Sequence, residues 1–85
     1  MQEQINAWFY PPVYVRTERP GIRYGVNNAT AAGEQLLKWT KRGPMWNKAV
    51  RVCVAVLAGE LPAEDARTAF EAAAEEEGKL LPPND

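Results

Sequence analysis

The chain has 85 residues, of which 46% are hydrophobic and 25% are charged, with a formal net charge of −1. This length fits one domain, and the composition is that of an ordinary globular protein, which excludes a disordered chain and a catalytic domain joined to a second module. No stretch approaches the roughly 20 apolar residues of a membrane span, and the first residues do not resemble a secretory signal, so we expect neither a membrane protein nor a secreted one.

The first twelve residues are predicted to form an arm. They end in an aromatic and proline cluster that runs from Trp8 to Pro12. Two successive prolines forbid a helix there, and each pushes the residue before it toward extended geometry. We expect the aromatic side chains of residues 1–12 to fold back on the core.

A β-hairpin is predicted next. Residues 13–17 are short, β-branched and alternating, which favours a half-buried strand, and residues 22–26 alternate again. Pro20 and Gly21 are turn residues between them. The second strand places three apolar side chains on one face: Ile22, Tyr24 and Val26. Because an isolated hairpin is marginally stable, we expect helices to cover its apolar face.

A first helix is predicted from a cap at Asn27 or Asn28 to about Trp39. Its apolar side chains fall within an arc of roughly 160°. Glu34 and Lys38 lie opposite that arc, four residues apart and in the favourable order. This pattern indicates a surface helix with one buried side.

A second helix is predicted from about Met45 to Ala58. Pro44 suits its first turn, where the missing N–H costs nothing, and Gly59 suits its C-terminal end. Its apolar arc spans roughly 200°, which leaves only a narrow polar strip. We therefore expect the second helix to be the central helix of the domain.

A third helix is predicted from near Leu61 to Gly78. It carries a stripe of alanines with one aromatic anchor, Phe70, and alanines permit a close approach to the second helix. Residues 79–85 are expected to be a flexible tail. The domain itself is then residues 13–78, an α+β fold of a two-stranded antiparallel hairpin followed by three helices (ββααα).

Charge is spread unevenly along the chain. Residues 1–59 hold eight bases and three acids, whereas residues 60–85 hold two bases and eight acids. In the favoured interpretation the two segments fold against each other and partly neutralise. In the alternative interpretation the basic segment presents a face to a polyanion.

The sequence offers little for catalysis or metal binding. It contains no histidine, so the commonest general base and metal ligand is missing, and no phosphate-binding glycine motif is present. Its one cysteine, Cys53, lies on the apolar arc of the second helix and is expected to be a buried core residue. A lone cysteine also favours a reducing cytoplasm. We expect no enzyme activity, no cofactor and no metal.

Two charged features have structural interpretations. Arg67 has Glu64 three residues before it and Glu71 four residues after it, which predicts a local ion pair. Alternatively, Arg67 reaches past its helix to hold a loop carbonyl or a partner. The acidic run 75–77 is expected to be a solvated helix end, because successive helical positions diverge by about 100° and cannot converge on one ion.

The basic segment from Lys38 to Arg51 is the most suggestive feature for function. It contains no acid and is interleaved with Trp39 and Trp46, a combination that single-stranded nucleic acid favours. Its bases are the candidate nucleic-acid-binding residues: Lys38, Lys41, Arg42, Lys48 and Arg51. Because periodicity places both tryptophans on buried arcs, base stacking is disfavoured, and nucleic-acid binding is the alternative hypothesis.

From about Trp8 to Gly78 the chain resembles the bacterial family known as domain of unknown function 982. Four stretches carry the resemblance: Pro12-Val13-Tyr14-Val15, Ala32-Gly33-Glu34-Gln35-Leu36-Leu37, the run from Lys48 to Gly59, and Ala66-Arg67-Thr68-Ala69-Phe70-Glu71-Ala72-Ala73-Ala74. The resemblance implies a bacterial, single-domain, cytoplasmic protein. It brings no catalytic residues with it.

Our leading hypothesis is a small interaction or regulatory module that binds another protein or a second copy of itself. A lone two-stranded sheet leaves two free edges, and pairing of hairpins across a dimer would bury them. The candidate partner-binding residues are the aromatics of the arm and hairpin: Trp8, Phe9, Tyr10, Tyr14 and Tyr24. An enzyme that relies on Glu, Tyr and Arg alone is the least favoured hypothesis.

Overall fold

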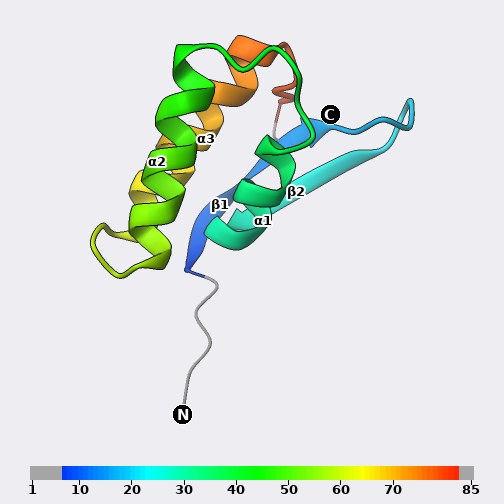
Figure 1. Cartoon of the computed structure of the whole chain (residues 1–85). Helices are drawn as coiled ribbons and strands as arrows, with labels where there is room; N and C mark the ends of the chain where they lie inside the picture. Colours follow the sequence, from blue (N-terminus) through cyan, green and yellow to red (C-terminus); the bar gives the residue numbers. More distant parts are fainter. Residues whose placement is uncertain (1–6, 83–85) are drawn as a thin grey trace.

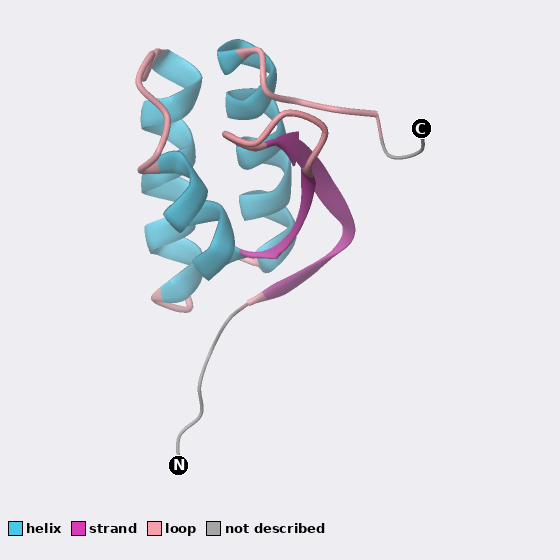
Figure 2. Cartoon of the chain, turned by 90° about the vertical axis from the view of Figure 1, so that its right-hand side faces the viewer, coloured by secondary structure: helices cyan, strands magenta, loops and turns pink. Residues whose placement is uncertain are grey.

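The computed structural model describes residues 7–82 and has the predicted ββααα order (Figure 1). Its elements are β1 (Trp8–Arg16), β2 (Arg23–Asn28), α1 (Ala29–Leu36), α2 (Pro44–Leu57) and α3 (Ala63–Glu77). The strands pair antiparallel in one sheet, and the helices lie on one side of it (Figure 2). The α+β class and the order of elements are therefore confirmed.

The hairpin packs its inward side chains against the helices. Val13 lies opposite Val26, and Val13, Val15 and Val26 are all buried. Gly21 in the turn has a φ of 82°, a left-handed conformation that glycine adopts without strain.

Strand β1 begins at Trp8, within the segment that we predict to be an arm. Trp8 pairs with Asn28, and the register becomes irregular between Trp8 and Val13. Pro11 and Pro12 account for the irregularity, because proline has no N–H to donate to a ladder. Residues 1–6 of the predicted arm lie outside the described residues.

A third segment pairs with the outer edge of β1. The amide of Arg16 donates to the carbonyl of Lys79 at 2.9 Å, and the amide of Leu81 donates to the carbonyl of Tyr14 at 2.9 Å. Leu80 forms an isolated antiparallel bridge with Val15. Lys79 to Leu81 therefore act as a short edge strand, although the sequence predicts a flexible tail from residue 79. Residues 83–85 of that tail lie outside the described residues.

The central helix is α3, not α2 as the apolar arc of α2 predicts. Helix α3 packs against α2, α1 and both strands, and Phe70 at its middle is fully buried. Helix α2 packs mainly against α1 and α3, and on its outer side Val54 is 63% exposed and Leu57 is also exposed. A broad apolar arc does not guarantee burial, because much of any protein surface is apolar. The small side chains of α3 let neighbours approach it from several directions.

The predicted helix ends are mostly confirmed. The side chain of Asn28 accepts a hydrogen bond from the amide of Ala31 at 2.7 Å and so caps α1, which ends at Leu36, three residues before the predicted end. Pro44 occupies the first turn of α2, and Gly78 ends α3 in the left-handed conformation.

The acidic end of α3 is not the solvated end that the sequence predicts. Glu76 Oε1 accepts a hydrogen bond from the amide of Met45 at 2.7 Å, and Glu77 Oε2 accepts one from the amide of Arg42 at 2.8 Å. Glu76 thus caps the N-terminus of α2 across the fold, where the helix dipole favours a carboxylate. Gly43 lies directly against this carboxylate, and a Cβ there would collide with it.

Candidate interaction surface

The outer face of the sheet, opposite the helices, carries exposed aromatic side chains. Because Val13 and Val15 point inward, alternation turns Tyr14 outward, and Tyr14 is half-buried there. Two further aromatic side chains lie in the irregular part of β1, where Trp8 is 64% exposed and Tyr10 is 81% exposed. We call these three residues the aromatic strip.

The other two candidate aromatics lie elsewhere. Phe9 is only 6% exposed and belongs to the hydrophobic core, so a partner has no access to it. Tyr24 lies opposite Val15 and therefore on the helix-covered side of the sheet, where it stays exposed near the hairpin turn. Three of the five candidate partner-binding residues, Trp8, Tyr10 and Tyr14, thus lie along β1 with at least part of the side chain accessible.

Tyr14 is the least exposed member of the aromatic strip. Its ring lies over the backbone of Gly25, its partner in the ladder, so that a Cβ at Gly25 would meet Tyr14 Cε1 at 2.8 Å. The guanidinium of Arg23 lies over the same ring, 4.8 Å from its centroid, and donates a hydrogen bond to the carbonyl of Pro82. Arg23, Tyr14 and Gly25 thus form a packed layer on the outer face.

The far edge of β2 is open. The amide of Thr17 donates a hydrogen bond to the carbonyl of Ile22, the residue before β2. Because hydrogen-bonded pairs alternate along an antiparallel ladder, the odd-numbered residues of β1 direct their backbone groups toward β2, and Val15 with Tyr24 is one such pair. The backbone groups of Gly25 and Asn27 consequently point away from β1. Within residues 7–82, no other element runs beside this edge (Figure 1).

Arg67 of α3 fixes the N-terminal half of β1. Its Nε donates to the carbonyl of Pro11 at 2.9 Å, while one terminal nitrogen lies 3.4 Å from Glu64 and 3.9 Å from Glu71. Both interpretations of Arg67 are therefore correct, because its guanidinium forms local ion pairs and also hydrogen-bonds to a backbone carbonyl outside its helix. The ion pairs hold the guanidinium in the orientation that it needs to hydrogen-bond to Pro11.

The candidate nucleic-acid-binding residues are dispersed. Arg42 donates to the carbonyls of Trp39 and Leu37, both at 2.9 Å, and its guanidinium lies 4.6 Å from the ring centroid of Trp46. Arg42 therefore satisfies carbonyls at the end of α1. Trp39 is buried, and the indole N–H of Trp46 donates to the carbonyl of Leu36.

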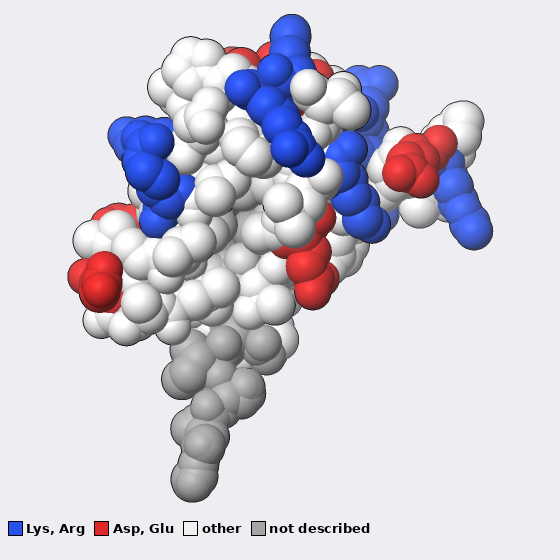
Figure 3. All heavy atoms as spheres, in the orientation of Figure 1, with Lys and Arg blue, Asp and Glu red and all other residues white. Residues whose placement is uncertain are grey.

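The other four bases of the segment point in different directions. Lys41 donates to the carbonyl of Glu76, Lys38 lines a cleft beside the hairpin, Lys48 lines a groove between α2 and α3, and Arg51 is exposed on α2. Figure 3 shows the basic side chains of one face in separate groups with uncharged surface between them. The arrangement contains no continuous basic surface for a nucleic-acid backbone on that face.

The described residues contain few groups suited to chemistry. Cys53 is buried, and burial raises the pKa of its thiol to about 11, which disfavours a reactive thiolate. Over residues 7–82 there is no cluster of three or more potential metal ligands. The helices within the same range are all too short or too polar to cross a membrane.

The sequence does not predict which edge of the sheet stays open. It predicts two free edges for the sheet, but the segment from Lys79 to Leu81 covers part of the edge of β1. This pairing joins residues more than 60 positions apart, and no local pattern marks it. The prediction that the aromatics of the arm fold back on the core is right only for Phe9, because Trp8 and Tyr10 are exposed.

A comparison with protein families matches residues 11–80 to a family described as protein of unknown function (DUF982). Neither a search of curated proteins nor a search of solved structures found a match.

Proposed function

Because the chain belongs to this family of proteins of unknown function, DUF982, whose description names no activity, we propose from its own geometry that it is a non-enzymatic interaction module that pairs with a second copy of itself along β2. The observation that carries this proposal is the open edge of β2. One edge of β1 is covered by Lys79 to Leu81, whereas the backbone groups of Gly25 and Asn27 face away from the sheet.

The edge of β2 is the longer free edge of the described sheet and favours a closed dimer, because the other edge is interrupted by the short pairing of Lys79 to Leu81. An exposed strand edge is a template for pairing with another chain. A sheet with two open edges can extend into a polymer, but a sheet with one can pair only once through a two-fold axis. The partly covered edge of β1 therefore favours a dimer over a fibre.

The sequence of β2 suits an antiparallel pair centred on Gly25. In that register Gly25 pairs with Gly25 of the second copy, and their outward amides and carbonyls satisfy each other. Arg23 then lies opposite Asn27 of the second copy, so that no like charges face each other across the axis. The two Tyr14 rings, each lying over its own Gly25, would flank the axis on the outer face.

The aromatic strip would border this contact. Trp8 pairs with Asn28 at the end of β2, so Trp8 lies close to the new edge, and Tyr10 follows it along β1. Aromatic side chains with polar tips are enriched in interfaces because they bury much apolar area. We propose Trp8 and Tyr10 as the residues whose exposure falls most on association.

The proposal includes the absence of catalysis and a cytoplasmic location. It is supported by the lack of histidine in the sequence and by the buried, high-pKa thiol of Cys53, a lone cysteine that suits a reducing compartment.

A proline at Asn27 tests the pairing. The amide of Asn27 points away from β1, so Asn27→Pro removes a hydrogen bond of the dimer without removing one from the hairpin. Asn27→Ala is the matched control, because it loses the same side chain and keeps the amide. Sedimentation velocity should give a dimer for the wild type and Asn27→Ala and a folded monomer for Asn27→Pro. A wild-type monomer at high concentration, or an Asn27→Pro dimer, would overturn the proposal.

A further inference from the structure

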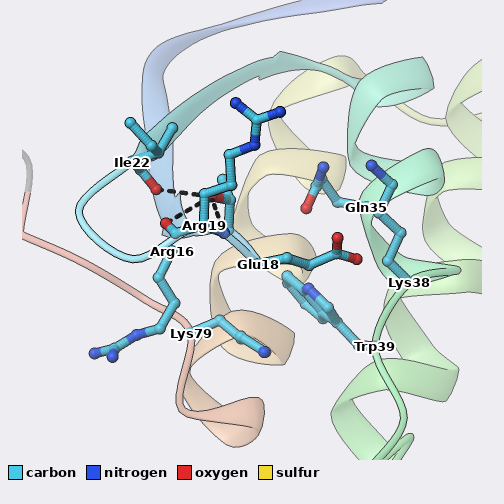
Figure 4. A pocket seen from close by; sticks show the side chains of 9 residues that line it. Arg16, Glu18, Arg19, Ile22, Gln35, Lys38, Trp39 and Lys79 are labelled. Carbon is cyan, nitrogen blue, oxygen red and sulfur yellow. Dashed lines mark hydrogen bonds between the residues drawn. The ribbon is translucent and has the colours of Figure 1, made fainter.

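A cleft of about 340 Å3 lies beside the hairpin turn (Figure 4). Three parts of the chain form its walls: the hairpin turn with the end of β1, the C-terminal part of α1 with the loop that follows it, and Lys79 beyond α3. We call it the hairpin cleft. Its volume lies at the lower end of the range of small-molecule sites, and its walls combine the buried indole of Trp39 with polar side chains.

The lining of the hairpin cleft is strongly cationic. Four of its side chains are basic, Arg16, Arg19, Lys38 and Lys79, and only Glu18 is acidic. Within the described part of the chain none of these five side chains forms an ion pair. Their charges are therefore not neutralised by the fold, although most other bases near the end of α1 hold carbonyls of the chain.

Gln35 is a second and independent feature of the hairpin cleft. It is only 9% exposed, and its side-chain amide makes no hydrogen bond to any described residue. Figure 4 shows this amide turned toward the cleft. Because this amide has no partner among the described residues and opens to the cleft, both its donor and its acceptor are available to a bound molecule.

We propose that the hairpin cleft binds a small phosphate monoester. A phosphate monoester carries a charge of about −1.5 to −2 at neutral pH and three strong acceptor oxygens. Four bases against one acid give the lining a net positive charge that suits a dianion, although Figure 4 shows the guanidinium groups of Arg16 and Arg19 turned away from Gln35 and Trp39. Lys38 and Lys79 contact the phosphate group, Arg16 and Arg19 strengthen the field at the rim, and Gln35 binds a hydroxyl or amide group of the organic part.

Glu18 regulates access to this site. Figure 4 shows its side chain extending from the hairpin turn into the cleft, toward the region between Gln35 and Trp39. Its carboxylate therefore occupies the space of a ligand anion and repels one. Binding displaces the Glu18 side chain, and removal of its charge raises affinity.

The test is a titration of the full chain, followed by two-dimensional ¹⁵N NMR, with ribose 5-phosphate as the probe. Saturable shifts are expected at the side-chain amide of Gln35 and the indole N–H of Trp39. Inorganic phosphate should bind more weakly, because it cannot reach Gln35, and acetate should not bind. Absence of shifts at Gln35 and Trp39 at millimolar ribose 5-phosphate, or equal affinity for acetate, would overturn the proposal.

Three variants assign the site. Lys38→Gln and Lys79→Gln should each weaken binding about tenfold, because each removes a charged hydrogen-bond donor. Glu18→Gln should strengthen binding about fivefold, through the loss of a like charge, and a misfolded variant cannot mimic that gain. Arg51→Gln, on the exposed side of α2, is the control that should leave affinity unchanged. Equal effects of Arg51→Gln and Lys79→Gln, or no gain from Glu18→Gln, would contradict the assignment.

Discussion

The ring of Tyr14 lies across the backbone of Gly25, with no room for a Cβ between them. This contact joins the two strands on the face of the sheet that no helix covers within the described residues. It also places a residue without a side chain at the middle of the open edge of β2. The absence of a side chain at Gly25 therefore makes room for the Tyr14 ring and also suits the proposed pairing of two chains.

Substitution of Gly25 should destabilise the fold through Tyr14. Gly25→Ala places a methyl group 2.8 Å from Tyr14 Cε1, so the ring must shift, at a cost of about 1–2 kcal/mol in the free energy of unfolding. Urea denaturation measures this cost. In a Tyr14→Ala background the same substitution should cost much less. An equal cost in both backgrounds would show that the ring is not the obstacle.

Loss of the Glu76 carboxylate should destabilise α2. Glu76→Ala removes the acceptor for the amide of Met45, and loss of a helix cap typically costs about 1 kcal/mol. Glu75→Ala, at an exposed position of the same turn, is the control and should change the free energy of unfolding by less than about 0.5 kcal/mol. Equal effects of the two substitutions would argue against a capping role for Glu76.

Arg67 should matter for β1 more than for its own helix. Arg67→Met keeps the apolar stem and loses the hydrogen bond to Pro11, so unfolding should become easier by about 1 kcal/mol. Hydrogen exchange should accelerate for amides in the first half of β1, near Trp8, and change little along α3. Faster exchange confined to α3 would assign Arg67 only to its ion pairs with Glu64 and Glu71.

Cys53 should resist thiol reagents, and its ionisation should lower the free energy of unfolding at alkaline pH. Burial raises the pKa of its thiol from 9.0 to about 11, so the unfolded chain releases the proton first. The contribution of the neutral thiol to stability is complete below pH 9 and declines as the pH rises from 9 toward 11. Cys53→Ala should lack this decline in urea denaturation. Rapid labelling of the native wild type at pH 8 would contradict the burial.

The sequence was sufficient to predict the order of elements, because local residues determine it. Pro44, Gly59 and Gly78 mark helix ends through their own backbone limits, and Asn28 caps α1 through a hydrogen bond three residues away. The irregular start of β1 likewise follows from two prolines that the sequence displays.

Tertiary contacts between distant residues could not be predicted in the same way. The apolar arc of α2 gave no information on which of its apolar residues would be covered, and Val54 stays exposed. The cap formed by Glu76 and the pairing of Leu80 with Val15 join positions 31 and 65 residues apart. The hairpin cleft depends equally on such contacts, because it forms between Gln35 of α1 and the hairpin turn only once the turn lies beside α1.

The central claim is that the open edge of β2 pairs with a second chain. Hydrogen exchange at the amides of Gly25 and Asn27 measures this pairing directly, because these amides point away from β1 and are protected only by a partner. The account predicts slow exchange at high protein concentration and faster exchange on dilution, with the amides of Tyr24 and Val26 protected at both. Fast exchange of Gly25 and Asn27 at every concentration would contradict it.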